Sequence, residues 1–224
     1  MAGLLMARRK EIVEELLDLS GIEESLMEQG YQLVCGVDEV GRGPLAGPVV
    51  AAAVILPRGL ELAGIDDSKK LSPEKREDIY RRMVDARIPC AIGIIDSETI
   101  DKVNILRASL LAMRKAVSEL SMAPDCILVD GSYTIPNLHQ PQYAIIGGDA
   151  RCRSIGAASI VAKVTRDRIM ARYQELHPQF SFSIHKGYPT PQHLAELEKH
   201  GPCAIHRRSF GPVAQKLAQY AIFE

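Results

Sequence analysis

Four acidic residues could together bind divalent metal ions. Asp38 and Glu39 are adjacent, Asp130 ends a buried apolar run, and Asp149 follows a Gly-Gly pair just after another run. Carboxylate ligands without nitrogen or sulfur suit Mg²⁺ or Mn²⁺ rather than zinc. If the four groups converge, they raise one another's pKa unless cations are bound. We therefore expect Asp38, Glu39, Asp130 and Asp149 to be catalytic and metal-binding residues.

Such a site is suited to chemistry at phosphorus. Mg²⁺ binds few protein carboxylates and keeps water ligands, so a substrate phosphate can complete its coordination shell. Two ions about 4 Å apart can activate a water and stabilise the leaving oxygen of an in-line displacement. The acidic pattern therefore predicts metal-dependent hydrolysis of a phosphodiester, provided that the carboxylates meet at one edge of a sheet.

The turn after the first two carboxylates contains Gly41, Arg42 and Gly43. Glycines let backbone groups approach a ligand closely, and a backbone loop could read a ribose 2′-hydroxyl. A plain tight turn is the alternative interpretation of this pattern. Because adjacent strand residues point to opposite faces, we expect the strand to end at Asp38. The turn would then re-aim Glu39, leaving Asp38 as the central ligand.

Basic and aromatic residues in two loops could contact nucleic acid. Tyr188 precedes a proline and could stack on a sugar or base, with Lys186 at a phosphate. Lys69 and Lys70 lie in another loop and could also touch phosphates, although a solvated loop is equally compatible with the pattern. Residues 206–210 form a second basic cluster with the same two interpretations.

Hydrophobic periodicity predicts an α/β protein. We expect strands over residues 33–37, 48–56, 91–95, 126–129 and 143–146. Helical spacing is found over residues 8–19, 22–29, 97–120, 154–176, 191–200 and 213–221. We expect an N-terminal helical appendage over residues 1–30 and a catalytic domain over residues 31–224 that includes the C-terminal helices.

Bulk composition is that of an ordinary globular protein, with 46% hydrophobic and 25% charged residues. No stretch approaches the ~20 apolar residues of a membrane span, and the N-terminal order of apolar and basic residues is unlike a secretory signal. We therefore expect a cytoplasmic protein without a membrane partner. The five cysteines form no CxxC pair, which disfavours a disulfide framework and a zinc site.

Charge is unevenly distributed along the chain. Residues 151–224 carry 11 Lys and Arg against 5 Asp and Glu, whereas residues 1–150 carry 16 against 23. This asymmetry indicates an acidic cluster in one part and an anion-binding surface in the other.

Residues 35–44, CGVDEVGRGP, resemble the opening signature of ribonuclease HII, the bacterial type 2 ribonuclease H. Further blocks match in the same order, and the resemblance covers residues from about Val34 to Val213. These blocks are DSKKLS at 67–72, IDKVNIL at 100–106, VDG at 129–131, GGD at 147–149, AASIVAKVTRD at 157–167, HKGYPT at 185–190 and RRSFGP at 207–212.

The resemblance implies an RNase H-like fold, with a five-stranded mixed sheet flanked by helices and a helical C-terminal part. It implies cleavage on the 5′ side of a ribonucleotide, in RNA/DNA hybrids and in DNA with embedded ribonucleotides, leaving 3′-hydroxyl and 5′-phosphate ends. The family's metal-binding carboxylates fall on the four acidic residues above. Its 2′-hydroxyl reader falls on Gly41, Arg42 and Gly43, and its junction-sensing tyrosine on Tyr188. We expect a monomer that uses Mg²⁺ or Mn²⁺.

Three alternatives differ in substrate or in activity. A ribonuclease HIII-like enzyme would prefer long RNA/DNA hybrids, but its loop has a lysine-containing variant and it lacks the tyrosine that matches Tyr188. A DNA resolvase of the broader RNase H-like class would cut all-DNA substrates. A catalytically inactive nucleic-acid-binding module would be expected to lack a carboxylate, and all four are present. Asp167, within a helical segment, is expected to be structural.

Overall fold

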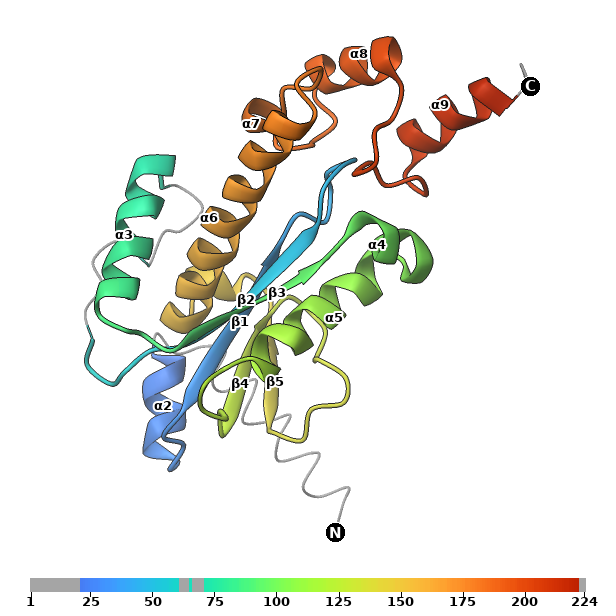
Figure 1. Ribbon diagram of the computed structural model, residues 1–224. Coiled ribbons are helices and arrows are strands. Elements are labelled where there is room, and N and C mark those ends of the chain that lie inside the picture. The colour runs from blue at the N-terminus through green and yellow to red at the C-terminus, as the bar shows by residue number, and fades with distance from the viewer. Residues whose placement is uncertain (1–20, 61–64, 66–70, 222–224) are drawn as a thin grey trace.

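The fold is described by a computed structural model covering residues 21–60, 65 and 71–221 (Figure 1). A single sheet of five strands has the order β3-β2-β1-β4-β5. β1 is antiparallel to β2 and parallel to β4, so the sheet is mixed. The strands are β1 (Val34–Val40), β2 (Val49–Ile55), β3 (Cys90–Ile95), β4 (Cys126–Asp130) and β5 (Gln142–Ile145).

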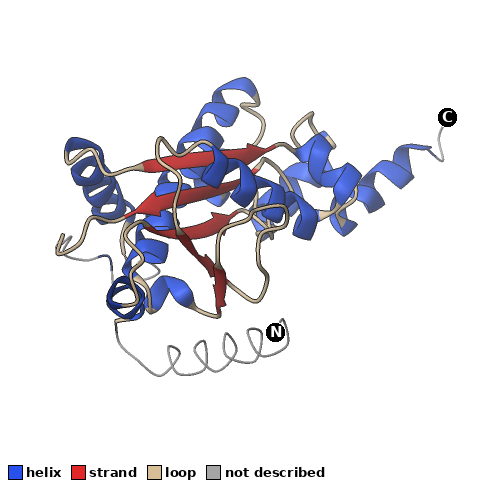
Figure 2. Cartoon of the chain, turned by 90° about the horizontal axis from the view of Figure 1, so that it is seen from below, coloured by secondary structure: helices blue, strands red, loops and turns tan. Residues whose placement is uncertain are grey.

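Helices cover both faces of the sheet, as Figures 1 and 2 show. α6 with α3 and α2 lie on one face, α4 and α5 lie on the other, and α7 to α9 extend beyond the end of α6. The predicted RNase H-like architecture is confirmed. The helices are α2 (Ile22–Glu28), α3 (Pro73–Asp85), α4 (Ser97–Val103), α5 (Ile105–Ser118), the short 3₁₀ helix η2 (Gly148–Ala150), α6 (Arg153–Leu176), α7 (Phe182–His185), α8 (Pro191–His200) and α9 (Gly211–Ala221).

The alternation of side chains along the strands decides which face each carboxylate occupies. In β1, Cys35 and Val37 pack in the core cluster that contains α5. Val34, on the opposite face, packs with Ile155 of α6. Asp38 has the same parity as Val34 and therefore belongs to the α6 face. The same alternation in β4 places Asp130 on that face.

Two glycines let helices lie directly against the sheet. A Cβ atom at Gly36 of β1 would overlap the backbone of Ser154 and Ile155 in α6. A Cβ at Gly93 of β3 would overlap the backbone of Ala112 in α5. Because neither contact involves a movable side chain, the close approach of both helices requires glycine at these two strand positions.

Several sequence-based expectations need revision. The helix expected over residues 97–120 is two helices, because Asn104 adopts φ 70° and caps α5 through its side chain, which accepts from the Arg107 N–H. α3 was not predicted, although Ser72 and Pro73 form an ordinary helix start, with the Ser72 hydroxyl accepting from the Lys75 N–H. α7 is a single turn and was also not predicted.

The expected N-terminal appendage is only partly described. Residues 1–20, including the helix expected over 8–19, lie outside the described residues. α2 packs into the core through Ile22 and Leu26, which are 1% and 0% exposed. The Glu23 carboxylate accepts hydrogen bonds from the Ser154 amide and hydroxyl, each at 2.8 Å. The boundary at residue 30 stays a prediction, but α2 packs against the sheet and α6 and shares their hydrophobic core.

Among the described residues, no helix combines the length and apolar character needed to span a lipid bilayer.

We predict that Gly36→Ala lowers the free energy of unfolding by about 3 kcal/mol, because the added methyl group overpacks a rigid backbone contact. Urea denaturation followed by circular dichroism measures this change. Gly211→Ala is the matched control, since a Cβ there meets nothing within 4 Å, and its effect should stay below about 1 kcal/mol. Equal effects of the two substitutions would contradict the packing argument.

Candidate active site

The first two carboxylates lie on a strand that is longer than predicted. β1 continues through Val40, with Asp38 opposite Ala52 and Glu39 opposite Ala51. The expected strand end at Asp38 is therefore wrong, because ladder pairing with β2 extends beyond it. Glu39 nevertheless lines the same cavity as Asp38, and its carboxylate pairs with the Arg42 guanidinium at 3.2 Å.

The cavity lies on the α6 side of the sheet and has a volume of about 340 Å³. β1 and β4 contribute carboxylates, α6 contributes a hydroxyl and an amine, and the loop before α8 contributes an aromatic ring. Its lining residues are Asp38, Glu39, Val40, Arg76, Asp130, Ser159, Ile160, Lys163 and Tyr188.

Negative charge in this cavity is poorly solvated. Burial, and then the charges of Asp130 and Glu39, raise the pKa of Asp38 well above its ordinary value. Burial also raises the pKa of Glu39, against the opposing effect of Arg42. Asp38 Oδ1 accepts a hydrogen bond from the Glu39 amide at 2.7 Å. A bound cation would favour the ionised form of both carboxyl groups.

The remaining two acidic residues are connected through the backbone of η2. Asp130 Oδ1 accepts a hydrogen bond from the Gly148 amide at 2.7 Å. Asp149, the next residue, is 2% exposed and is not among the residues that line the cavity. The structure therefore brings Asp38, Glu39 and Asp130 into one cavity and places Asp149 beside it. Across the described ranges, no three Asp, Glu, His or Cys side chains form a ready-made metal site.

The two glycines of the loop after β1 have different surroundings. Gly41 adopts φ +96°, and a Cβ there would overlap the Arg166 side chain. A Cβ at Gly43 would meet only the Tyr188 ring, at 3.7 Å. Gly41 is thus required by packing beneath the loop, whereas Gly43 is exposed and lies beside the Tyr188 ring. Only the second arrangement fits a direct approach of substrate to the backbone.

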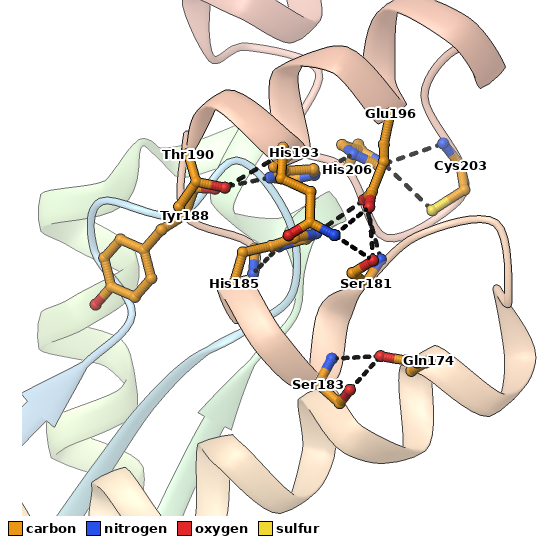
Figure 3. Close-up of polar contacts among 12 residues, drawn as sticks. Gln174, Ser181, Ser183, His185, Tyr188, Thr190, His193, Glu196, Cys203 and His206 are labelled. Carbon is orange, nitrogen blue, oxygen red and sulfur yellow. Dashed lines mark hydrogen bonds and ion pairs between the residues drawn. The ribbon is translucent and has the colours of Figure 1, made fainter.

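Tyr188 is 38% exposed, and its backbone is held from three directions (Figure 3). Its amide donates to the His185 carbonyl at 2.9 Å. Its carbonyl accepts from the Thr190 amide at 2.8 Å and lies 2.9 Å from His193 Nδ1. The ring is therefore carried on a fixed backbone at the edge of the cavity.

A buried histidine cluster, formed by His185, His193 and His206, contacts this backbone (Figure 3). The Cys203 amide donates to His206 Nδ1 at 3.0 Å, so the ring proton of neutral His206 lies on Nε2. That proton is donated to His193 Nε2 at 3.1 Å. Neutral His193 then carries its own proton on Nδ1, which donates to the Tyr188 carbonyl. The chain of contacts is satisfied only when both rings are neutral.

The pKa shifts of the cluster agree with this assignment. Burial and the neighbouring His193 lower the pKa of His206 to about 3. Burial, with His185 stacked beside it, lowers the pKa of His193. Burial of Glu196 acts to raise its pKa, but hydrogen bonds from Ser181 and from His185 outweigh it and lower the pKa to about 2.

The predicted lysines have separate outcomes. Lys186 is half-buried, and burial lowers the pKa of its amine. Lys69 and Lys70 lie outside the described residues. Sequence reasoning missed Ser159 and Lys163, whose separation by one helical turn on α6 was the available signal. Asp167 pairs with Lys163 at 2.6 Å and with Arg76 at 3.7 Å.

Comparisons with known proteins agree with the geometry. The family model described as Ribonuclease HII matches residues 35–213. Ribonuclease HII of Caldicellulosiruptor saccharolyticus is 49% identical over 189 residues, which cover 84% of this chain and 92% of that protein. Ribonuclease HII of Pelotomaculum thermopropionicum is 53% identical over 202 residues, covering 89% of this chain and 76% of that protein.

A solved structure shares the fold. The ribonuclease H2 from Pyrococcus horikoshii OT3 superposes with a TM-score of 0.70 at 24% identity, covering 84% of this chain and 98% of that chain. At this identity the likeness shows the fold alone.

We predict that acid weakens folding through His206. Its pKa is about 3 in the folded protein and about 6.5 in an unfolded chain. Between these values the unfolded chain binds the additional proton, so the free energy of unfolding falls as the pH falls. His206→Gln removes this dependence. From pH 7 to pH 5, its stability should therefore fall by less than that of the unsubstituted protein, with a difference of up to about 2 kcal/mol.

Urea denaturation at both pH values measures this difference. His139→Gln is the matched control, because His139 is exposed and lies outside the cluster. An identical pH dependence in His206→Gln and the unsubstituted protein would count against the neutral histidine chain.

Proposed function

This chain belongs to the ribonuclease HII family of endoribonucleases, and on that premise we propose that it cleaves on the 5′ side of a ribonucleotide in duplexes. The proposed substrates are RNA/DNA hybrids and DNA with embedded ribonucleotides, and the proposed products carry 3′-hydroxyl and 5′-phosphate ends. The observation that carries the proposal is the cavity in which carboxylates from β1 and β4 lie beside Gly43 and Tyr188. The expected monomeric state and cytoplasmic location stay predictions.

The donor set of the cavity fits Mg²⁺ or Mn²⁺. Its acidic ligands are all carboxylates, and burial with mutual repulsion raises the pKa of Asp38 and Glu39. Asp38, Glu39 and Asp130 would hold the ions, with Asp149 adjacent to Asp130. When bound, two such ions supply an activated water and charge stabilisation at the leaving oxygen. Glu39 pairs with Arg42 through Oε1, and a carboxylate has a second oxygen that can ligate an ion at the same time.

The chain's own residues would place the substrate relative to this site. The exposed Gly43 backbone and the neighbouring Tyr188 ring form the surface on which the ribose would lie. An aromatic ring can stack on a sugar or base, and backbone groups near Gly43 can contact the 2′-hydroxyl. Lys163, from α6, lines the cavity and places a positive charge near the carboxylates, where a substrate phosphate would lie. We infer that Gly43 and Tyr188 select the ribonucleotide, while the carboxylates serve the cleavage.

The ribonuclease HIII-like alternative receives less support. The family model that matches is that of ribonuclease HII, and the loop retains Gly41, Arg42 and Gly43, with Tyr188 beside it. A preference for long hybrids over single ribonucleotides would nevertheless favour it.

Cleavage of three labelled duplexes tests the proposal. They contain one ribonucleotide in DNA, a full RNA/DNA hybrid, or DNA alone. With Mg²⁺ or Mn²⁺ the protein should cut the first two and spare the third, and a chelator should stop cleavage. Cleavage of the all-DNA duplex, or undiminished activity with chelator, would contradict the proposed function.

Asp38→Asn should reduce turnover on the single-ribonucleotide duplex by about a thousandfold, because several kcal/mol of metal-dependent stabilisation are lost. Binding of the duplex should change little, since binding depends mainly on phosphate contacts. Gel-shift and cleavage assays separate the two quantities. Asp85→Asn, an exposed site outside the cavity, is the control for loss of one negative charge. Retained cleavage by Asp38→Asn would remove this residue from the site.

Tyr188→Ala should reduce the preference for the RNA–DNA junction by about tenfold, since stacking on a sugar or base is lost. Tyr188→Phe should keep most of the preference, because the ring is retained. The measurement is kcat/KM on the single-ribonucleotide duplex relative to the full hybrid. An unchanged ratio in Tyr188→Ala would rule out the proposed selection by this side chain.

A further inference from the structure

Two arginines are buried beneath the loops that border the cavity. Arg166 of α6 and Arg207, which precedes α9, are each 0% exposed. Within the described part of the chain, neither guanidinium forms an ion pair with a carboxylate. Burying a cation without a counter-ion is costly unless its N–H groups are fully hydrogen-bonded. The N–H groups of each buried guanidinium therefore need hydrogen-bond acceptors.

The acceptors are backbone carbonyls of the two loops. Arg207 donates to Gly41 O at 2.6 Å, to Arg42 O at 3.0 Å and to Gly47 O at 3.0 Å. Arg207 is itself fixed, because its amide donates to the Leu45 carbonyl at 2.8 Å and its guanidinium lies 5.0 Å from the Phe210 ring centroid.

Arg166 connects the same loop to the tyrosine loop. Its guanidinium donates to Pro48 O at 3.0 Å, to Ala46 O at 3.1 Å and to Lys186 O at 3.0 Å. The Gly41–Gly47 segment and the segment before Tyr188 are thus held by one side chain. The two arginines together fix the two loops that carry Gly43 and Tyr188.

The planarity of the peptide bond gives the contacts of Arg207 a direct consequence. In a trans peptide the C=O and N–H bonds point in opposite directions. The carbonyls of Gly41 and Arg42 point inward to Arg207, so the amides of Arg42 and Gly43 point outward. Across the described ranges, neither amide has a hydrogen-bond acceptor. A cation bound to a carbonyl also polarises its peptide group and strengthens the N–H as a donor.

We propose that Arg207 is a positioning residue for ribonucleotide recognition, which presents the amides of Arg42 and Gly43 as paired donors to the 2′-hydroxyl oxygen. This inference rests on the proposed function and identifies Arg207 as the residue that orients the two amides. Arg207 does not touch the substrate. Its effect is transmitted through two peptide groups, and a lysine cannot replace it because one ammonium lacks the planar fork that reaches adjacent carbonyls.

Arg207→Lys tests the proposal with charge retained. The readout is the ratio of dissociation constants for the all-DNA and single-ribonucleotide duplexes, measured in the presence of a chelator. The substitution should reduce this ratio about tenfold, through weaker binding of the ribonucleotide duplex alone. Binding of the all-DNA duplex should stay within about twofold, because phosphate contacts are unchanged. Arg107→Lys, at an exposed arginine of α5 on the other face of the sheet, should leave both constants unchanged.

A second measurement does not depend on the folding of a variant. In the isotope-labelled, unsubstituted protein, the amide resonances of Arg42 and Gly43 should shift more on adding the single-ribonucleotide duplex than on adding the all-DNA duplex. Equal shifts with the two duplexes would overturn the proposal.

The outcomes separate this inference from the proposed function. If the unsubstituted protein prefers the ribonucleotide duplex and Arg207→Lys retains the full preference, the role of Arg207 is refuted while the function stands. If the unsubstituted protein binds both duplexes equally but cleaves the ribonucleotide duplex, the role of Arg207 is also refuted while the function stands. If it does not cleave the ribonucleotide duplex with metal present, the proposed function itself is refuted.

Discussion

The contact between α6 and β1 sets the spacing of every other functional element. Gly36 allows the two backbones to touch, so the α6 face of the sheet and the residues along α6 become the two sides of one cavity. Asp38 lies on the sheet side, whereas Ser159 and Lys163 lie on the helix side. Further along the same helix, Arg166 reaches the loop after β1. A shift of α6 would therefore move the Lys163 amine and both loops relative to the carboxylates of the sheet.

Buried polar groups, in addition to the apolar packing of Leu45 and Ala46, hold the loops at the edge of the cavity. Arg166 and Arg207 donate to backbone carbonyls, and neutral His193 and His206 hold the Tyr188 backbone. In a low-dielectric interior such bonds are strong, and leaving any member unpaired is costly. These networks therefore specify one loop geometry. The exposed Gly43 backbone and the Tyr188 ring, which lines the cavity, are held on this rigid support.

The cavity itself is electrostatically unfavourable without a cation. Burial and mutual repulsion raise the pKa of Asp38 and Glu39, and Arg42 partly offsets the charge of Glu39. Mutually repelling carboxylates held by rigid loops fit a site that binds cations, which would neutralise the carboxylate charge.

Much of this arrangement could be predicted from the sequence because it depends on local chemistry. The continuous apolar runs of β1 and β4, the acidic residues at their ends and the glycine-rich turn are local signals, and they pointed to Asp38, Asp130 and Gly43. The break at Asn104 and the start of α3 also have local signals, because asparagine tolerates a positive φ and caps helices, and Ser72-Pro73 is an ordinary helix start.

Contacts between distant segments required the tertiary structure. The sequence by itself determined which residues carry charge, which segments are strands and helices, and which motifs belong to the ribonuclease HII family. Only the folded chain decided that β1 continues past Asp38, that Gly41 packs on Arg166, and that Arg207 reaches the carbonyls of the first loop. Each depends on atoms brought together across more than a hundred residues or on ladder pairing with another strand, and local periodicity contains no information about such partners.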